Sequence, residues 1–167
     1  KSTGSWYTVK EEAGPTVACR IKGKFRLDEL KSTNPVSVGD RVTFEMDDIT
    51  GNGVITHIHE RKNYIIRKAT NLSKQTHILA ANIDQAILLV TINYPITTNI
   101  FIDRFLTSAE AYRIPVVLLF NKTDRYDAKH LAQMEELRAV YESIGYETRA
   151  LSAKNQENLD EIRELLR

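Results

Sequence analysis

Cysteine, long hydrophobic runs and glycine are all scarce in this sequence of 167 residues. The single cysteine, Cys19, excludes an internal disulfide and a multi-cysteine zinc site, and we interpret it as a small apolar residue in a strand. The longest apolar stretches, such as 86–90, are far shorter than the roughly 20 residues that cross a bilayer. The first five residues lead into no apolar run, so we expect no signal peptide. These absences favour a soluble protein of a reducing cytoplasm.

Charge is distributed unevenly along the chain. Residues 1–75 hold 13 Lys and Arg and 9 Asp and Glu, a net charge of +4, whereas residues 76–167 hold 10 and 13, a net charge of −3. Such an asymmetry indicates two parts with different partners. We therefore expect two domains, 1–75 and 76–167.

The first part has the pattern of an all-β module. Its short runs of β-branched and aromatic residues are separated by turn signals that contain Gly, Pro and Asn. The runs predict strands at Ser5–Lys10, Thr16–Lys22, Arg41–Met46, Gly53–Glu60 and Tyr64–Arg67. Five short strands in this length fit an OB-like barrel, a fold that commonly binds nucleic acid, although an SH3-like barrel would give almost the same pattern.

The second part alternates between strands and helices. Buried-type strands are predicted at Gln85–Ile92, Val116–Phe120 and Glu147–Leu151, and helices at about 98–113, 128–143 and 158–166. This order implies a parallel sheet with helical crossovers, as in part of an α/β domain. Ligands of such sheets bind beyond the carboxyl ends of the strands.

The link between the two parts, 61–77, contains basic residues and no acid. It is either a connector whose charges are only solvated or a strip that contacts RNA phosphates. The candidate RNA contacts are Arg61, Lys62, Arg67, Lys68 and Lys74. The four histidines are interpreted as ordinary residues, with RNA contact open for His57 and His59.

The sharpest motif is Asn121-Lys122-Thr123-Asp124, which directly follows a predicted strand and precedes a helix. The carboxylate of Asp124 has two acceptor oxygens, so it can take both N1–H and the 2-amino group of guanine, which adenine lacks. The methylenes of Lys122 can lie along one face of the base, and Asn121 is suited to tying neighbouring loops together. The alternative is a plain loop in which Asp124 or Asp127 caps the next helix.

A second short motif, Ser152-Ala153-Lys154, follows the next predicted strand. The backbone N–H of Ala153 could donate to guanine O6, and Lys154 could cover the other face of the base. Alone, this tripeptide is an ordinary turn. Two such turns at the ends of adjacent parallel strands would form one pocket, so together they predict a guanine site.

The phosphate-binding half of a GTP site is missing. No G-x-x-x-x-G-K-[ST] loop occurs in the sequence, and no Asp-x-x-Gly turn follows a strand to hold magnesium. We therefore expect no catalytic or metal-binding residue in this chain, and only weak GTP binding by the chain alone.

Taken together, the motifs resemble the bacterial circularly permuted GTPases that depend on the small ribosomal subunit, the GTPase A family. The resemblance rests on the two guanine-type turns and on segments at 61–67, 80–85 and 102–106, with Val38-Gly39-Asp40 as the barrel turn. The order is diagnostic, since the guanine turns follow the barrel with no phosphate loop before them.

This resemblance implies a GTPase that assists late maturation of the small ribosomal subunit and binds GTP or GDP. The barrel would contact ribosomal RNA. Mg²⁺ and Zn²⁺ are expected only in the full-length protein, because the family carries its phosphate loop and zinc domain later in the chain. We thus expect an inactive fragment of a monomeric cytoplasmic protein without membrane contact.

Two other hypotheses stay open. The chain could be a non-catalytic RNA-binding module, a barrel joined to an α/β platform. That reading explains the basic link but not the two guanine-type turns. Another kind of α/β nucleotide binder is less favoured, because no G-x-G-x-x-G follows a strand.

Overall fold

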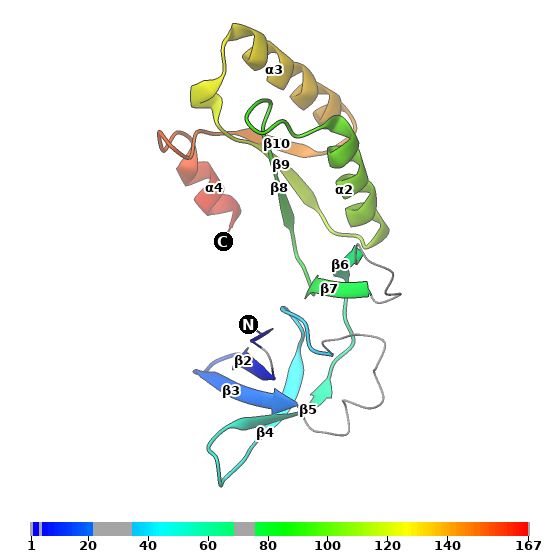
Figure 1. Cartoon of the computed structure of the whole chain (residues 1–167), viewed down its shortest axis with the longest axis vertical. Helices are drawn as coiled ribbons and strands as arrows, with labels where there is room; N and C mark the ends of the chain where they lie inside the picture. The colour runs from blue at the N-terminus through cyan, green and yellow to red at the C-terminus, as the bar shows by residue number, and fades with distance from the viewer. Residues whose placement is uncertain (1, 4, 22–34, 69–75, 167) are drawn as a thin grey trace. The chain divides into compact units, whose positions relative to one another are not determined.

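A computed structural model describes the chain except at residues 1, 4, 22–34, 69–75 and 167. Its internal contacts divide the chain into two compact units, Lys1–Ile83 and Asp84–Arg167 (Figure 1). Each unit has its own hydrophobic cluster. The boundary expected between residues 75 and 76 adjoins the segment 69–75, which lies outside the described residues.

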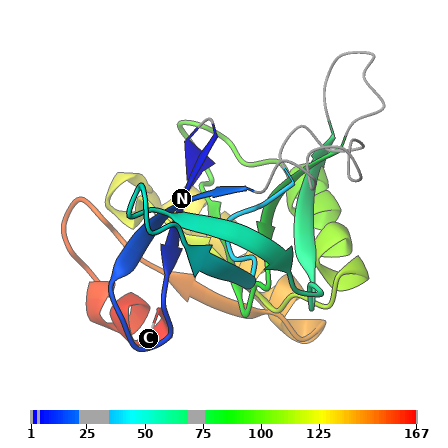
Figure 2. The same cartoon turned by 90° about the horizontal axis from the view of Figure 1, so that it is seen from below.

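The first unit contains a five-stranded sheet in the order β1-β2-β3-β5-β4. Neighbouring strands are antiparallel, except that β3 and β5 are parallel. Figure 2 shows the sheet turning from the blue N-terminal strands to the teal ones. No ladder joins β1 or β2 to β4 within the described residues, so this part of the sheet is not closed into a barrel. The strands are β1 (Ser2–Thr3), β2 (Trp6–Lys10), β3 (Thr16–Ile21), β4 (Val42–Met46) and β5 (Gly53–Ile58).

Alternate side chains of these strands point inward and form the core of the first unit. Tyr7, Cys19, Val36 and Ile55 are buried together, and partly buried aliphatic residues pack around them. Cys19 is fully buried in β3 as a free thiol, which confirms its interpretation as an apolar strand residue. Burial of the thiol raises its pKa, so the group stays protonated and unreactive.

The segment expected as the fifth strand of the barrel pairs elsewhere, which corrects the sequence prediction. β6 (Tyr64–Lys68) forms an antiparallel two-stranded sheet with β7 (Thr76–Ala81). The prediction failed because β7 was not recognised: it ends in two alanines, which have low strand propensity. With β7 close in sequence, the backbone hydrogen bonds of β6 are satisfied locally in a hairpin rather than in the larger sheet.

The turn at Val38-Gly39-Asp40 is fixed against β7. The N–H of Ala81 donates to the carbonyl of Val38 over 2.8 Å. Gly39 has φ +88°, and a Cβ at this position would lie 2.0 Å from the carbonyl oxygen of Ala81. Glycine is therefore required here by both backbone conformation and space.

The second unit is a three-stranded parallel sheet in the order β10-β9-β8 with helical connections. This confirms the expected alternation of strands and helices. Figure 1 shows α2 and α3 on one face of the sheet and α4 on the other. All five side chains of β9 are buried, as expected for the central strand. The elements are β8 (Ala86–Val90), α2 (Asn99–Ala111), β9 (Val116–Phe120), α3 (Ala128–Ser143), β10 (Glu147–Ala150) and α4 (Leu159–Leu165).

Local signals set the ends of the two longer helices. Thr98 caps α2 by accepting from the N–H of Phe101, and Asp127 caps α3 by accepting from the N–H of His130. Gly145, with φ +96°, lies just beyond the end of α3. The cap at Asp127 places the start of α3 immediately after the turn that follows β9.

Candidate functional site

The turn that follows β9 continues directly from the sheet. The N–H of Asn121 donates to the carbonyl of Val90 in β8 over 2.9 Å. Lys122 then adopts a left-handed conformation with φ 71°, and Thr123–Arg125 form a single 3₁₀ turn, η1. A left-handed conformation is unfavourable for a residue with a side chain, so neighbouring contacts must hold this turn.

The turn after β9 and the turn after β10 lie together, as the sequence predicted. The hydroxyl of Ser152, which is fully buried, donates to Oδ1 of Asp124 over 2.6 Å. The N–H of Ala153 donates to Oδ1 of Asn121 over 3.2 Å, and the N–H of Thr123 donates to the carbonyl of Leu151 over 3.3 Å. Three hydrogen bonds therefore join the two turns at one edge of the sheet.

The contacts of Asp124 leave part of its carboxylate available. Ser152 engages Oδ1, whereas Oδ2 accepts no hydrogen bond from the residues that the structure describes. The side chain of Asp124 is only partly buried. A carboxylate held at one oxygen is thus presented in a fixed direction at the rim of the sheet.

Asn121 ties the loops together, as its amide was expected to do. Its Oδ1 accepts from the N–H groups of both Lys122 and Ala153. The N–H of Ala153 is the donor that the sequence analysis assigned to guanine O6. That N–H would therefore have to be shared with Asn121 or released from it when a base binds.

The side chain of Lys122 reaches the loop after β8. Its Nζ donates to the carbonyl of Tyr94 over 2.5 Å. The guanidinium of Arg125 lies over the ring of Tyr94, 5.4 Å from the ring centroid. Lys154 lies on the exposed turn after Ser152. The loop that carries Tyr94 thus flanks the candidate site, a role that sequence reasoning missed.

Sequence reasoning also missed Tyr126, which lies under the turn. Its hydroxyl donates to the carbonyl of Asn121 over 2.6 Å and accepts from the N–H of Ile92 over 2.9 Å. Burial raises the pKa of this phenol, and the nearby charge of Asp124 raises it further, although the bond from Ile92 opposes both. The signal available in the sequence was a tyrosine two residues beyond Asp124.

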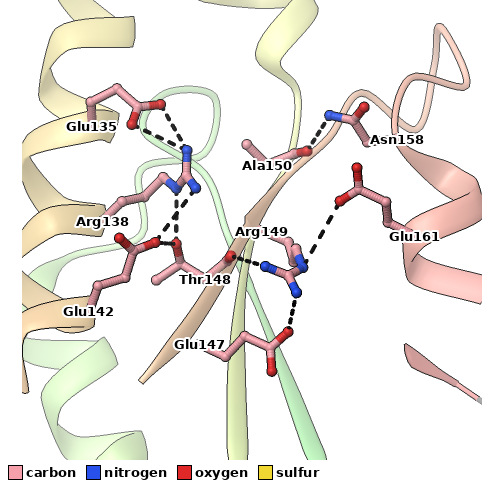
Figure 3. Close-up of polar contacts among 9 residues, drawn as sticks. All are labelled: Glu135, Arg138, Glu142, Glu147, Thr148, Arg149, Ala150, Asn158 and Glu161. Atoms are coloured by element: carbon pink, nitrogen blue, oxygen red, sulfur yellow. Dashed lines mark hydrogen bonds and ion pairs between the residues drawn. The ribbon is translucent and has the colours of Figure 1, made fainter. Parts of the chain in front are cut away.

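The strand that leads to Ser152 is held by polar contacts on both sides (Figure 3). On the α3 side, the buried hydroxyl of Thr148 accepts from Nε of Arg138 over 2.9 Å and donates to Glu142. Next along the strand, Arg149 pairs with Glu147 over 2.7 Å and lies 4.0 Å from Glu161 of α4. These contacts set the position of β10 between the two helices.

Asp124 and Ser152 also depend on the loop before α4. The N–H of Asn155 donates to the hydroxyl oxygen of Ser152 over 3.1 Å. The side-chain amide of Asn158 donates to the carbonyl of Ala150 over 2.9 Å (Figure 3). The hydroxyl of Ser152 is therefore oriented by a donor behind it, so that its own proton points at Asp124.

The candidate RNA contacts of the basic link have different surroundings. The guanidinium of Arg61 forms two hydrogen bonds of 2.7 Å with the carboxylate of Asp40, whose side chain is completely buried. Lys62 is exposed. Arg67 and Lys68 belong to β6, but their side chains lie outside the described residues, as does all of Lys74.

His57 and His59 lie on the surface of the first unit. The rings of His57 and His59 meet edge to face, with centroids 4.9 Å apart. His59 also shares a hydrogen bond of 3.0 Å with the hydroxyl of Thr43.

No metal site is formed by the part of the chain that the structure describes, since no three His, Cys, Asp or Glu side chains gather there. Among the described helices, none has the length and apolar character needed to cross a membrane.

Comparison with known proteins agrees with this geometry. The sequence profile of the RsgA N-terminal domain matches residues 1–55, and that of the RsgA GTPase matches residues 58–167. The small ribosomal subunit biogenesis GTPase RsgA of Christiangramia forsetii is 57% identical over 98% of this chain and 53% of its own length. The chain spans about half the length of the curated relatives that it matches.

Two solved structures are similar over nearly the whole chain. YjeQ from Thermotoga maritima has a TM-score of 0.76 and 38% identity, covering 98% of this chain and 54% of that one. YloQ, described as a circularly permuted GTPase, has a TM-score of 0.71 and 27% identity, covering 99% of this chain and 54% of that one. On these matches and on the paired turns at 121–124 and 152–154, the chain belongs to the RsgA GTPase family.

Proposed function

We propose that this chain supplies the guanine-reading part of a GTPase that acts in biogenesis of the small ribosomal subunit. The observation that carries the proposal is the carboxylate of Asp124, held by Ser152 over 2.6 Å at the shared edge of β9 and β10. A guanine base placed there would offer N1–H and its 2-amino group to this carboxylate. The name of the 57% identical relative supports GTP hydrolysis and the ribosomal role.

In this proposal the residues that contact the base are those of the two turns. Asp124 reads the Watson–Crick edge, Lys122 and Lys154 cover the two faces, and Ala153 donates to O6. Asn121 and Ser152 hold the turns in place. Hydrolysis of GTP also requires a phosphate loop, with Mg²⁺ at the phosphates. No phosphate-loop motif occurs among the 167 residues.

The first part of the chain, 1–75, is proposed to contact ribosomal RNA, and 76–167 to be the guanine-reading domain. The strand order β1-β2-β3-β5-β4 with its parallel β3–β5 pair supports an OB-like barrel, a partly open five-stranded Greek-key barrel that binds nucleic acid. Lys62, Arg67, Lys68 and Lys74 are the proposed phosphate contacts, whereas the guanidinium of Arg61 is engaged by Asp40. We further propose that the protein acts as a monomer in the cytoplasm.

The test is Asp124→Asn in the complete gene product that contains this sequence. Guanine carries an amine at C2 and xanthine a carbonyl, so an amide in place of the carboxylate should favour xanthine. We expect affinity for GDP to fall about a hundredfold and affinity for XDP to rise, as measured by displacement of a fluorescent nucleotide. Asp127→Asn, which alters a nearby helix cap, is the matched control. Unchanged preference in Asp124→Asn would leave only the RNA-binding part of the proposal.

A further inference from the structure

Two backbone groups just beyond the ends of neighbouring strands meet a single side chain. The N–H of Ile92 lies two residues beyond β8, and the carbonyl of Asn121 lies directly after β9. The hydroxyl of Tyr126 accepts from the first over 2.9 Å and donates to the second over 2.6 Å. One hydroxyl therefore closes the gap between the two strand ends.

These strand ends are also the origin of the turn that carries Asp124. Tyr126 is the residue that ends η1, and its own N–H donates to the carbonyl of Thr123 over 3.1 Å. Only 9% of Tyr126 is exposed, so its ring and hydroxyl form the floor of the turn. The turn from Asn121 to Tyr126 is thus a closed loop whose two ends are joined by the hydroxyl.

The joined ends matter because the turn between them contains an unfavourable backbone conformation. Lys122 has φ 71°, which a residue with a side chain adopts only where its surroundings hold it. Without the hydroxyl, the buried N–H of Ile92 and the partly buried carbonyl of Asn121 would lose their partner, and the turn would relax by moving the residues between them. Asp124 lies in that interval, two residues from Lys122 and two from Tyr126.

We propose that Tyr126 is a positioning residue for guanine recognition, whose hydroxyl fixes the turn so that Asp124 can bond to the 2-amino group of the base. This inference rests on the proposed function and adds a residue that does not itself touch the nucleotide. The raised pKa of the phenol agrees with this role, because the hydroxyl must keep its proton to donate to Asn121.

The experiment compares GDP with IDP, whose base lacks only the 2-amino group. The ratio of the two affinities reports the bond between Asp124 and that amine, and not the general stability of the fold. In the complete gene product, Tyr126→Phe should lower GDP affinity about tenfold and the ratio of GDP to IDP affinity at least about threefold. Both are measured by displacement of a fluorescent nucleotide.

Tyr141→Phe is the matched control. Tyr141 is also buried in the second unit, and its hydroxyl donates to Asp103 of α2 over 3.0 Å, away from the two turns. This control should lose stability but keep the wild-type ratio of GDP to IDP affinity. Equal ratios in Tyr126→Phe and the wild type, or an equal loss in Tyr141→Phe, would overturn the role of Tyr126. A wild-type protein that binds GDP and IDP alike would instead overturn the proposed function.

If Tyr126→Phe does not fold, hydrogen exchange of the wild-type protein tests the same role of Tyr126. Binding of GDP should slow exchange of the Ile92 amide at least about tenfold more than that of the Ile144 amide at the end of α3. This is expected because base binding and the hydroxyl bridge stabilise the same turn. Equal slowing at both amides under saturating GDP would refute the inference.

Discussion

The hydroxyl of Ser152 donates to the carboxylate of Asp124 over 2.6 Å, although 28 positions separate the two residues in the sequence. The contact exists because parallel strands β9 and β10 end at the same edge of the sheet. It fixes one oxygen of the carboxylate, while the other accepts no hydrogen bond from the residues that the structure describes. The specificity of the proposed site therefore depends on a serine that need not contact the base at all.

Removal of that hydroxyl should weaken nucleotide binding. In Ser152→Ala, we expect affinity for GDP to fall about tenfold, because Asp124 loses the donor that orients it. Ser143→Ala is the control, since Ser143 is exposed and its hydroxyl donates to the carbonyl of Val140 within its own helix. Calorimetric titration of both variants with GDP measures the effect. Comparable affinities in the two variants would argue against an orienting role for Ser152.

Thr148 should contribute to the stability of the second unit through its hydroxyl. The side chain is 2% exposed and lies between Arg138 and Glu142 (Figure 3). Thr148→Val keeps the shape but leaves Nε of Arg138 without its acceptor, so we expect a loss of about 1–3 kcal/mol in the free energy of unfolding. Urea unfolding followed by helical circular dichroism reports it, since the helices that the structure describes all lie in this unit. Thr107→Val, at an exposed position of α2, is the control. An equal loss there would contradict a stabilising role for the hydroxyl of Thr148.

Much of the second unit was predictable because its signals are local. The apolar run at 116–120 and the cap at Asp127 define β9 and the start of α3 from adjacent residues alone. Parallel strands must end at one edge, so the meeting of Asp124 with Ser152 followed from topology. Tyr126 could not be assigned in this way, because its two partners depend on how far the side chain folds back beneath the turn.

The first unit was less predictable because its pairings are not local. Strand Tyr64–Lys68 has the pattern of a barrel strand, yet its partner β7 was hidden by weak strand propensity at Ala80 and Ala81. Likewise, the charge of Arg61 suggested a phosphate contact, but its partner Asp40 is 21 positions earlier. Sequence patterns identify a charged residue, whereas only the fold decides whether that charge is already paired.

Arg61 and Lys62 should therefore differ sharply in what they contribute to the stability of the first unit. Arg61→Met leaves the buried carboxylate of Asp40 without its ion pair, so we expect the free energy of unfolding of the first unit to fall by about 3 kcal/mol. Lys62→Met, at the exposed neighbouring position, should change it by less than about 0.5 kcal/mol. Fluorescence of Trp6, the one tryptophan of the sequence, follows urea unfolding of this unit. A smaller loss for Arg61→Met than for Lys62→Met would show that the ion pair between Arg61 and Asp40 does not stabilise the first unit.

For RNA binding we expect the opposite order: among folded variants, Lys62→Met should have the larger effect and Arg61→Met the smaller one. Lys62→Met should reduce affinity for ribosomal RNA and lower the slope of log affinity against log salt by about one unit, because one phosphate contact is lost. Folded Arg61→Met should keep the wild-type slope. RNA binding is measured at several salt concentrations, under conditions in which each variant is folded. An unaltered slope in Lys62→Met would remove this residue from the proposed RNA contacts.

Stability of the second unit should fall at high pH because of Tyr141. Burial, followed by the hydrogen bond and charge of Asp103, raises the pKa of Tyr141 from 10 to about 12. The folded state thus holds the phenolic proton more tightly than the unfolded state does. The resulting stability is fully present below about pH 10 and is lost as the pH rises toward about 12.

Tyr141→Phe should therefore reduce this dependence on pH. We expect the urea midpoint of the second unit to fall less steeply between about pH 9.5 and pH 11.5 in Tyr141→Phe than in the wild type. Some slope should remain, since the pKa values of Tyr126 and Tyr146 are also raised by burial. Asp103→Asn keeps the phenol but removes the charge beside it, so its slope should be intermediate. Identical slopes in all three proteins would show that Tyr141 does not titrate differently in the folded and unfolded chains.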